Sequence, residues 1–520
     1  MKLTCLLTLS LSLSLGVSCS KVYTGGNHLK NYQQFSISQD IPTTPTCDEQ
    51  CVLYRKEFRY VVYAGKQIYC YWDEKKTDTG TDFDQLATKL ESQITTKYSL
   101  QNYYLLLMTW AAAFHDGHVN AMIGKVSPAS FEFYEPNIRF ELLNAGTDSE
   151  KLIVAKIGDD VKNLKVGTLV TSINGKPWTE IYEKAVSLSS GSTVRMRRKQ
   201  AARHNLALLL GQTDGFKLHI EGEFDDQPVA EDIARELLLD DGQIAPPVEK
   251  TGIELIHAKV LEGNIGYLRI DGFQGTKIRE LLDQAMQRLF KTERLLIDVR
   301  ANGGGDLSGD SVLSYLIEQP IFRYAAEVRN SDLLLGLRPA LNFVFNFQSA
   351  DWSVPHNYLV QPKMKFQGPV AVLTSTICFS ACDTFLTALQ ENHLAHVIGE
   401  STGGGTGTPL VLDLPVSNLQ FRYSVQKGFK PVSHKLLEGQ GTEVDQLIAP
   451  TVDEKQKSLD TQLALALNYV RNLPTATSAS SAPASLTKLT EIIPAEPEKI
   501  QKSPLSELND AIQISGAETN

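Results

Sequence analysis

The spacing of apolar and polar positions predicts helices in the first quarter of the chain. Residues 86–94 carry apolar side chains at helical spacing, and residues 103–114 form a nearly continuous apolar run. That run ends at a sequence from His115 to His118 that contains Asp and Gly, which is typical of a turn. We therefore expect a mostly helical N-terminal region over residues 20–124.

The pattern then changes to that of short strands, the clearest at 152–157 and 169–173. The second strand is followed by Asn174-Gly175, a pair that tolerates positive φ and is typical of a tight turn between strands. We expect a β-rich domain over residues 125–224. The acidic segment 225–250 closes with two prolines and is interpreted as a linker.

Strand and helix patterns alternate over residues 251–473, which predicts an α/β domain. The strands are near-continuous apolar runs, as expected in a sheet that is covered on both faces. The predicted strands are 265–270, 295–299 and 370–374, and the predicted helices are 276–290, 307–317 and 380–393. Residues 474–520 are rich in Ser, Ala, Thr, Pro, Glu and Lys, so we expect a flexible tail there.

Composition excludes several function classes. The 520 residues are 42% hydrophobic and 21% charged, which is ordinary for a globular protein. Acidic residues outnumber basic ones by 60 to 50, and the net charge of −10 argues against a nucleic-acid partner. No internal run of 18 or more apolar residues is present, which excludes a polytopic membrane protein.

The N-terminus predicts export. Lys2 precedes a Leu/Ser-rich apolar stretch and then small residues, the pattern of a secretory signal over residues 1–19. The sequence from Gly16 to Cys19 resembles a bacterial lipoprotein processing box, with Cys19 as the candidate lipid anchor. Ordinary cleavage near Ser18 or Ser20 is the alternative. Either way we expect an exported protein that is periplasmic, held at the outer membrane, or secreted.

Cysteine spacing gives two further expectations. Cys47, Cys51 and Cys70 lie close together in a chain expected to be exported, so we expect one disulfide among them, with the pairing left open. Cys378 and Cys382 flank Ser380, and we expect these two to be buried thiols.

Ser380 is a candidate nucleophile. It follows a buried strand and begins a helix, where free backbone N–H groups and the positive end of the helix dipole can stabilise an oxyanion. The alternative is a helix cap, because Asp383 follows three residues later and Ser is a favoured N-cap residue. A second loop, Gly303-Gly304-Gly305, also follows a buried strand and exposes backbone amides. It lacks the Lys of a phosphate-binding P-loop.

Four phrases occur in a fixed order: YLRIDGF at 267–273, LLIDVRANGGG at 295–305, FSACDTFLTALQEN at 379–392 and VIGESTGGGTG at 397–407. Together they resemble the tail-specific (C-terminal processing) serine peptidase family. The resemblance implies a ClpP/crotonase-like α/β peptidase domain with a PDZ-like domain upstream. The phrase KVGTLVTSINGKP at 165–177 resembles a PDZ signature, with Thr where Asp is common. An unrelated β-hairpin is the alternative for that phrase.

By this resemblance Ser380 is the nucleophile, and the N–H groups of Gly303, Gly304 and Ala381 form the oxyanion hole. The general-base lysine that part of the family has about 25 residues after the serine is absent here. The chain instead resembles the Ser–His–Glu branch, which includes tricorn-like proteases and the chlamydial protease-like activity factor. His118, in the phrase Asp-Gly-His, matches its base, and Glu438, 58 residues after the serine, matches its acid.

Rival assignments stay open for each position. His115 competes with His118, and the two histidines are also a candidate metal fragment, although a His-Glu-x-x-His motif is absent. Glu443 or Asp445 could replace Glu438. A cysteine nucleophile is the rival to the serine. The resemblance implies no metal and no cofactor.

These residues predict an exported serine endopeptidase that hydrolyses protein or peptide substrates through an acyl-enzyme. The alternative is a non-hydrolytic peptide-binding or scaffold protein that keeps the domains without the chemistry. Residues 322–362 match no phrase of the family and are a candidate lid or homodimer contact.

Overall fold

The computed structural model describes residues 25–124, 134–211, 217–237, 252–347 and 351–474. The predicted signal segment and the predicted tail beyond Pro474 lie outside these described residues. Within them, no helix combines the length and the apolar character needed to cross a bilayer.

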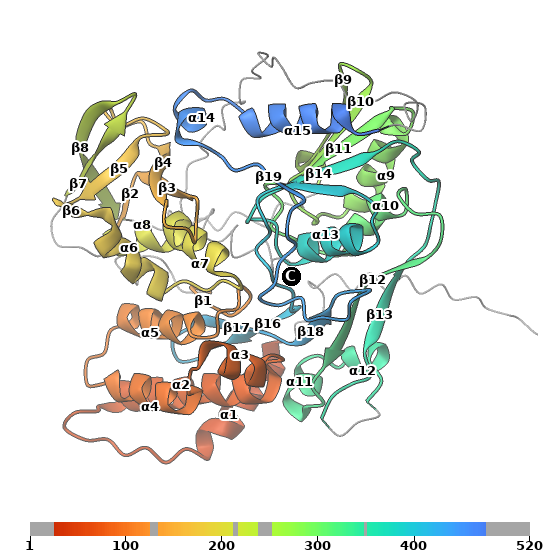
Figure 1. Ribbon diagram of the computed structural model, residues 1–520. Helices are drawn as coiled ribbons and strands as arrows, with labels where there is room; N and C mark the ends of the chain where they lie inside the picture. The colour runs from red at the N-terminus through yellow and green to blue at the C-terminus, as the bar shows by residue number, and fades with distance from the viewer. Residues whose placement is uncertain (1–24, 125–133, 212–216, 238–251, 348–350, 475–520) are drawn as a thin grey trace, which may run out of the picture.

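A six-stranded sheet forms the centre of the C-terminal half (Figure 1). Its strand order is β19-β15-β14-β11-β10-β9, and only β9 runs antiparallel to its neighbour. The strands predicted at 265–270 and 370–374 are found with those bounds. The strands are β9 (Ile256–Leu261), β10 (Ile265–Ile270), β11 (Arg294–Asp298), β14 (Val370–Thr374), β15 (His396–Gly399) and β19 (Gln446–Leu447).

Helices cover both faces of this sheet (Figure 1). Ile297 and its neighbours on one face pack with helices α9 (Ile278–Leu289) and α13 (Ala381–Glu391). Leu296 and its neighbours on the other face pack with α15 (Thr461–Asn472). Because alternate side chains are buried on opposite faces, the strands read as unbroken apolar runs rather than as alternating ones.

The N-terminal region is helical and packs on a three-stranded sheet of order β1-β17-β16. Its first strand, β1, pairs antiparallel with β17, with Ala121 opposite Phe421. Trp110 Nε1 donates to the hydroxyl of Tyr423, 2.8 Å away. The helices are α1 (Gly25–Ile37), α2 (Glu49–Ile68), α3 (Trp72–Thr79), α4 (Phe83–Gln93) and α5 (Leu100–Ala112). The strands are β1 (Asn120–Met122), β16 (Pro409–Asp413) and β17 (Gln420–Ser424).

A second domain contains a seven-stranded sheet of order β2-β8-β7-β5-β4-β3, with β6 beside β5. Asn174 and Gly175 have φ of 50° and 73°, so the tight turn expected at this pair is present. The strands are β2 (Tyr134–Pro136), β3 (Ile138–Leu143), β4 (Lys151–Ile157), β5 (Leu169–Ile173), β6 (Lys176–Pro177), β7 (Lys217–Phe224) and β8 (Gln227–Leu237). The helices are α6 (Trp178–Ser187), α7 (Val194–Gln200), a π-helical turn (Ala201–Asn205) and α8 (Leu206–Gly211).

Two predicted boundaries are wrong. Strand β8 occupies much of the segment 225–250 that was interpreted as a linker, and β7 and β8 form a hairpin. Its turn residues, Asp225 and Asp226, have φ of 53° and 56°, so their acidic character marks a turn instead of a linker. The helix expected at 307–317 is shortened to a 3₁₀ turn (Leu307–Gly309) and α10 (Asp310–Leu313).

The segment 322–362, which matched no family phrase, forms part of a three-stranded antiparallel sheet of order β13-β12-β18. Its central strand contributes Arg323, whose side chain is fully buried against α13. The elements are β12 (Ile321–Val328), α11 (Asp332–Leu337), α12 (Leu341–Val344), β13 (His356–Val360) and β18 (Gln426–Phe429), and α14 (Val452–Gln456) precedes α15.

Candidate active site

Ser380 lies at a sharp turn before α13. Its φ is 58°, a left-handed conformation that non-glycine residues rarely adopt. Although it occupies the N-cap position, its side chain makes no capping hydrogen bond. Its backbone N–H donates to the carbonyl of Gly405, 2.8 Å away. These features argue against the simple cap reading, because the hydroxyl is not used to cap the helix.

The glycine loop meets this turn because β11 and β14 are parallel neighbours, so their following loops leave the same edge of the sheet. A Cβ atom placed on Gly304 would lie 2.8 Å from Ser380 Cβ and 3.1 Å from Ala381 N. Only glycine allows this close approach, and Gly304 also has a φ of 111°.

The three amides predicted for the oxyanion hole differ in their hydrogen bonding. The N–H of Ala381 begins α13, where an intrahelical acceptor is missing. The N–H of Gly304 donates to Asn302 Oδ1 at 2.9 Å and is therefore engaged. The N–H of Gly303 has no acceptor within the described part of the chain. Ala381 and Gly303 are thus the amides available to an oxyanion.

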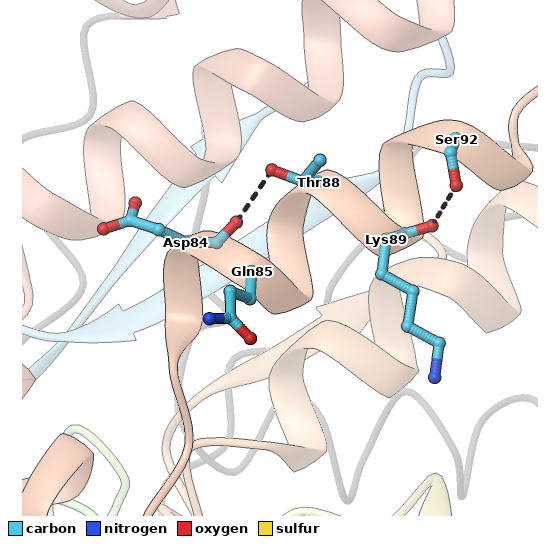
Figure 2. Close-up of a pocket in the computed structure, with 5 residues that line it drawn as sticks. All are labelled: Asp84, Gln85, Thr88, Lys89 and Ser92. Carbon is cyan, nitrogen blue, oxygen red and sulfur yellow. Dashed lines mark hydrogen bonds between the residues drawn. The ribbon is translucent and has the colours of Figure 1, made fainter.

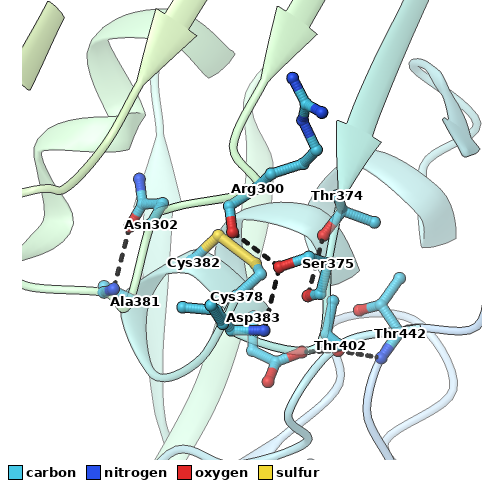
Figure 3. The surroundings of a disulfide bond; sticks show 12 residues. Arg300, Asn302, Thr374, Ser375, Cys378, Ala381, Cys382, Asp383, Thr402 and Thr442 are labelled. Carbon is cyan, nitrogen blue, oxygen red and sulfur yellow. Dashed lines mark hydrogen bonds between the residues drawn. A yellow bond between two sulfur atoms is a disulfide. The ribbon is translucent and has the colours of Figure 1, made fainter. Parts of the chain in front are cut away.

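Cys378 and Cys382 form a disulfide across the serine turn (Figure 3). The expectation of two buried thiols is therefore wrong. The turn at Ser380 brings the two Cα atoms to 5.3 Å, within the range that a disulfide spans. A cysteine nucleophile at either position is disfavoured, because neither sulfur is free. A second disulfide joins Cys47 to Cys51, and Cys70 is a buried free thiol.

Asp383 supports the loop that follows β15. Its buried carboxylate accepts hydrogen bonds from Gly404 N at 2.7 Å and from Gly405 N at 3.1 Å. It also accepts from the hydroxyl of Thr402, which lies beside it in Figure 3. Burial raises the pKa of Asp383 to about 6, and these three donors oppose the rise. Since Gly405 accepts from the backbone of Ser380, Asp383 helps to fix the serine turn.

Arg323 forms hydrogen bonds to the first turn of α13, the helix that follows Ser380. Its Nη2 donates to the carbonyl of Ala381 at 2.6 Å, and its Nε donates to Thr384 Oγ1 at 3.0 Å. Sequence reasoning missed this residue, because its segment lies outside every recognised phrase.

His118 is buried, and its ring packs on that of Phe379, with 4.5 Å between ring centroids. Its backbone N–H donates to Asp116 Oδ1 at 2.7 Å, and its Nδ1 is buried without a hydrogen-bond partner in the described residues. Burial, together with the positive charge of Arg422, lowers the pKa of His118 well below its usual value. The imidazole is therefore neutral at physiological pH and able to accept a proton.

Glu438 is buried as well. Its Oε1 accepts from Lys75 Nζ at 2.8 Å, while its Oε2 has no hydrogen-bond partner in the described residues. Burial raises the pKa of Glu438 to about 8; Asp116 adds to the rise and Lys75 opposes it.

The structure brings Ser380, His118 and Glu438 into one neighbourhood without joining them. Phe379, which precedes the serine, contacts His118. Ser192 links the other two segments, since its hydroxyl accepts from Gly117 N at 3.0 Å and interacts with Glu438. Within the described residues, no hydrogen bond connects the three side chains to one another. Such bonds commonly tighten only when substrate binds.

The rival residues are engaged elsewhere. The side chain of His115 contacts Arg197, and burial, with the nearby Arg197 and Lys75 cations, lowers the pKa of His115 to about 4. Glu443 accepts from Ser401 Oγ at 2.6 Å and pairs with Arg195. Asp445 accepts from Val397 N at 2.8 Å at a strand edge. Among the described residues, no group of three or more His, Cys, Asp or Glu side chains could hold a metal ion.

Sequence reasoning missed two charged residues beside the site. Asp116 was visible as the first residue of the Asp-Gly-His phrase, but its contacts with Tyr69 and Ser424 were not. Lys75 lies in the highly charged helix α3, whose pattern indicates a solvated surface. No local signal marks it as buried.

A surface hollow of about 460 Å³ lies along α4 (Figure 2). The hydroxyls of Thr88 and Ser92 in it donate to carbonyls of their own helix. It is lined by Asp84, Gln85, Thr88, Lys89 and Ser92, none of which belongs to the candidate site.

The chain is similar to known peptidases in sequence and in fold. Residues 264–448 match the model of peptidase family S41. The crystal structure of mature CPAF is similar with a TM-score of 0.63 and 15% identity over 82% of this chain and 97% of that one. The structure of mature CPAF complexed with lactacystin has a TM-score of 0.62 and 14% sequence identity, and the match covers 82% of this chain and 98% of that one. The photosystem II D1 C-terminal processing protease has a TM-score of 0.43 and 13% sequence identity, and the match covers 81% of this chain and 97% of that one. The likeness to the CPAF structures shows a common fold.

Proposed function

Because the chain is a serine peptidase of the tail-specific protease family, we propose that it is an exported endopeptidase that cleaves polypeptides through an acyl-enzyme on Ser380. The observation that carries this proposal is the serine turn. A hydroxyl not used for capping stands beside the free N–H of Ala381, at a backbone conformation that is costly to maintain.

In the first step His118 accepts the proton of Ser380 Oγ as that oxygen bonds to the scissile carbonyl carbon. The amides of Ala381 and Gly303 donate to the resulting oxyanion. The carbon–nitrogen bond then breaks, and the imidazolium gives its proton to the departing amine. Water attacks the ester in the same way and regenerates the serine.

In its ionised form Glu438 accepts from the ring of His118 and stabilises the imidazolium. Two buried atoms that have no hydrogen-bond partner in the described part of the chain support this pairing: His118 Nδ1, which can donate, and Glu438 Oε2, which can accept. A buried polar atom without a hydrogen-bond partner costs about 1–3 kcal/mol, so a hydrogen bond between these two atoms would stabilise the site.

The β-rich second domain is proposed to be PDZ-like, on the strength of the 165–177 phrase and the turn at Asn174. Export and a lipid anchor at Cys19 rest on the N-terminal sequence alone. Cell fractionation of the wild type and of Cys19→Ala tests both. An anchored lipoprotein moves from the membrane to the soluble exported fraction on this substitution, whereas a freely soluble protein does not change fraction.

A fluorophosphonate probe tests the catalytic proposal. We expect covalent labelling of the wild type at Ser380, loss of labelling in Ser380→Ala, and hydrolysis of denatured proteins only by the wild type. Both assays are repeated after limited proteolysis, which activates a latent precursor. If neither treated nor untreated protein is labelled or hydrolytic, the scaffold alternative replaces the proposal.

A further inference from the structure

Lys75 is a buried cation beside the candidate site, and it has no role in the proposed acyl-enzyme steps. It is only 4% exposed, although it belongs to the charged helix α3. Its Nζ donates to Glu438 Oε1 at 2.8 Å and to the backbone carbonyl of His115 at 2.7 Å. One ammonium group therefore binds both the loop that carries the proposed acid and the turn that carries the proposed base, His118.

Burial and a neighbouring carboxylate both disfavour the ionised form of Glu438, and the contact with Lys75 opposes them. Asp116 is close enough to repel it, and burial removes the water that would otherwise stabilise a second carboxylate. The other titratable neighbours are the buried Tyr69, Cys70 and Tyr71, whose pKa values are all raised well above normal by burial first. They are therefore neutral at physiological pH, and neither a phenol nor a thiol can supply the positive charge that Glu438 needs. Lys75 is the cation that bonds Glu438 directly.

The geometry also divides the carboxylate into two unequal oxygens. Lys75 holds Oε1, and among the described residues Oε2 is a buried acceptor with no hydrogen bond, with the Ser192 hydroxyl close to the carboxylate. The matching buried orphan is His118 Nδ1.

We propose that Lys75 is a positioning residue of the peptidase site. Its ammonium group fixes one oxygen of Glu438, favours the ionised carboxylate over the protonated form, and ties it to the His115–His118 turn, so that the other oxygen is available to His118. This inference rests on the proposed Ser380–His118–Glu438 function.

A pH profile separates this role from a purely structural one. Burial raises the pKa of Glu438 to about 8, Asp116 raises it further, and Lys75 opposes the rise. Removing the ammonium group raises the pKa of Glu438 again. The carboxylate then ionises only at higher pH, so the rise of activity with pH moves upward.

The experiment measures the rate constant for fluorophosphonate labelling of Ser380 in the full chain, from about pH 5 to about pH 10. The variants are Lys75→Met, Lys75→Gln and Lys75→Arg. Lys455→Met is the matched control, because it breaks another lysine–glutamate pair, with Glu141 at 2.9 Å, outside the site. Thermal unfolding of each variant reports its fold.

We expect Lys75→Met and Lys75→Gln to label on the order of 100-fold more slowly at neutral pH, less than the loss of a triad member. The midpoint of their profiles moves upward by about one pH unit or more. Lys75→Arg, which keeps the charge, recovers part of the rate and the original midpoint. Lys455→Met keeps the wild-type profile.

Two results overturn the role of Lys75 while the wild type is labelled: unchanged rates in Lys75→Met and Lys75→Gln, or slower rates with an unmoved midpoint. If Lys75→Met does not fold, Lys75→Gln decides, since its amide still donates to His115. A wild type that is never labelled, before or after limited proteolysis, removes the proposed function and this inference with it.

Discussion

Arg422 Nε donates to the backbone carbonyl of His118 at 2.8 Å, although the two residues are 304 positions apart in the chain. Arg422 also stands opposite Asn120 in the pairing of β17 with β1. The hydrogen bond and the strand pairing therefore hold the same turn. Strand β17, in the second half of the chain, thus fixes the location of the proposed base.

Replacing Arg422 by Met tests this hold. The carbonyl of His118 loses its buried donor, so we expect the free energy of unfolding to fall by about 1–3 kcal/mol, with slower labelling of Ser380. Urea denaturation and fluorophosphonate labelling measure the two effects. Arg338→Met is the control, because Arg338 likewise donates to a carbonyl, that of Pro409 at 2.8 Å, outside the site. Equal labelling of both variants would contradict the expectation.

Glutamine replacements distinguish the two histidines of the turn. His118→Gln removes the proposed acceptor of the serine proton, and we expect labelling of Ser380 to slow by about 10⁴-fold. His115→Gln removes only a contact with Arg197, so we expect less than about a 10-fold change. Labelling rates measured at one pH settle the comparison. A larger loss in His115→Gln than in His118→Gln would exchange the two assignments.

Glu57 predicts a pH-dependent stability. It is fully buried, accepts from Val416 N at 2.6 Å, and has an Oε2 without a hydrogen-bond partner in the described residues. Burial raises the pKa of Glu57 to about 7, and its hydrogen bonds oppose the rise. Between about pH 4.5 and pH 7 the folded state holds more protons than the unfolded one, so stability falls as the pH rises.

Glu57→Gln removes this titration. The variant gains up to about 3 kcal/mol over the wild type between pH 5 and pH 8, with the difference appearing as the pH rises. Asp383 and Glu438, whose pKa values burial also raises, keep part of the pH dependence in both proteins. Urea denaturation of both proteins at about pH 5 and about pH 8 measures the difference in their free energies of unfolding. Parallel curves for the two proteins would show that Glu57 is not the source.

The cysteine pairing predicts a count of thiols. A form that begins at Lys21 contains Cys47, Cys51, Cys70, Cys378 and Cys382. With two disulfides and one free thiol, it takes up one alkylating group in denaturant and five after reduction. Intact mass measures both numbers, and peptide mapping places the single label on Cys70. Three labels without reductant would mean that one of the two disulfides is absent.

Sequence patterns located the central sheet well, because a strand that is buried on both faces is apolar at every position. Strands β10 and β14 have the predicted bounds, and α13 begins one residue after the predicted start. The acidic hairpin at Asp225 was misread, because a turn in an exposed hairpin has the same composition as a linker. The disulfide beside Ser380 was missed, because it depends on a rare backbone conformation that spacing does not encode.

Ser380 was assigned from an ordered phrase, and His118 and Glu438 from the resemblance to the Ser–His–Glu branch; their catalytic roles stay predictions. The structure brings the three segments together around Phe379 and Ser192, and within the described residues no hydrogen bond joins the three side chains. Lys75 was not predictable, because its burial depends on a partner 363 residues away. A charged helix is normally solvated, and only the tertiary fold makes this lysine internal.

The pairing of β1 with β17 has a consequence for biosynthesis. A ribosome makes the His118 turn early, yet the strand that anchors it emerges some 300 residues later. The proposed triad therefore cannot assemble on a growing polypeptide until β17 and Glu438 have both been synthesised.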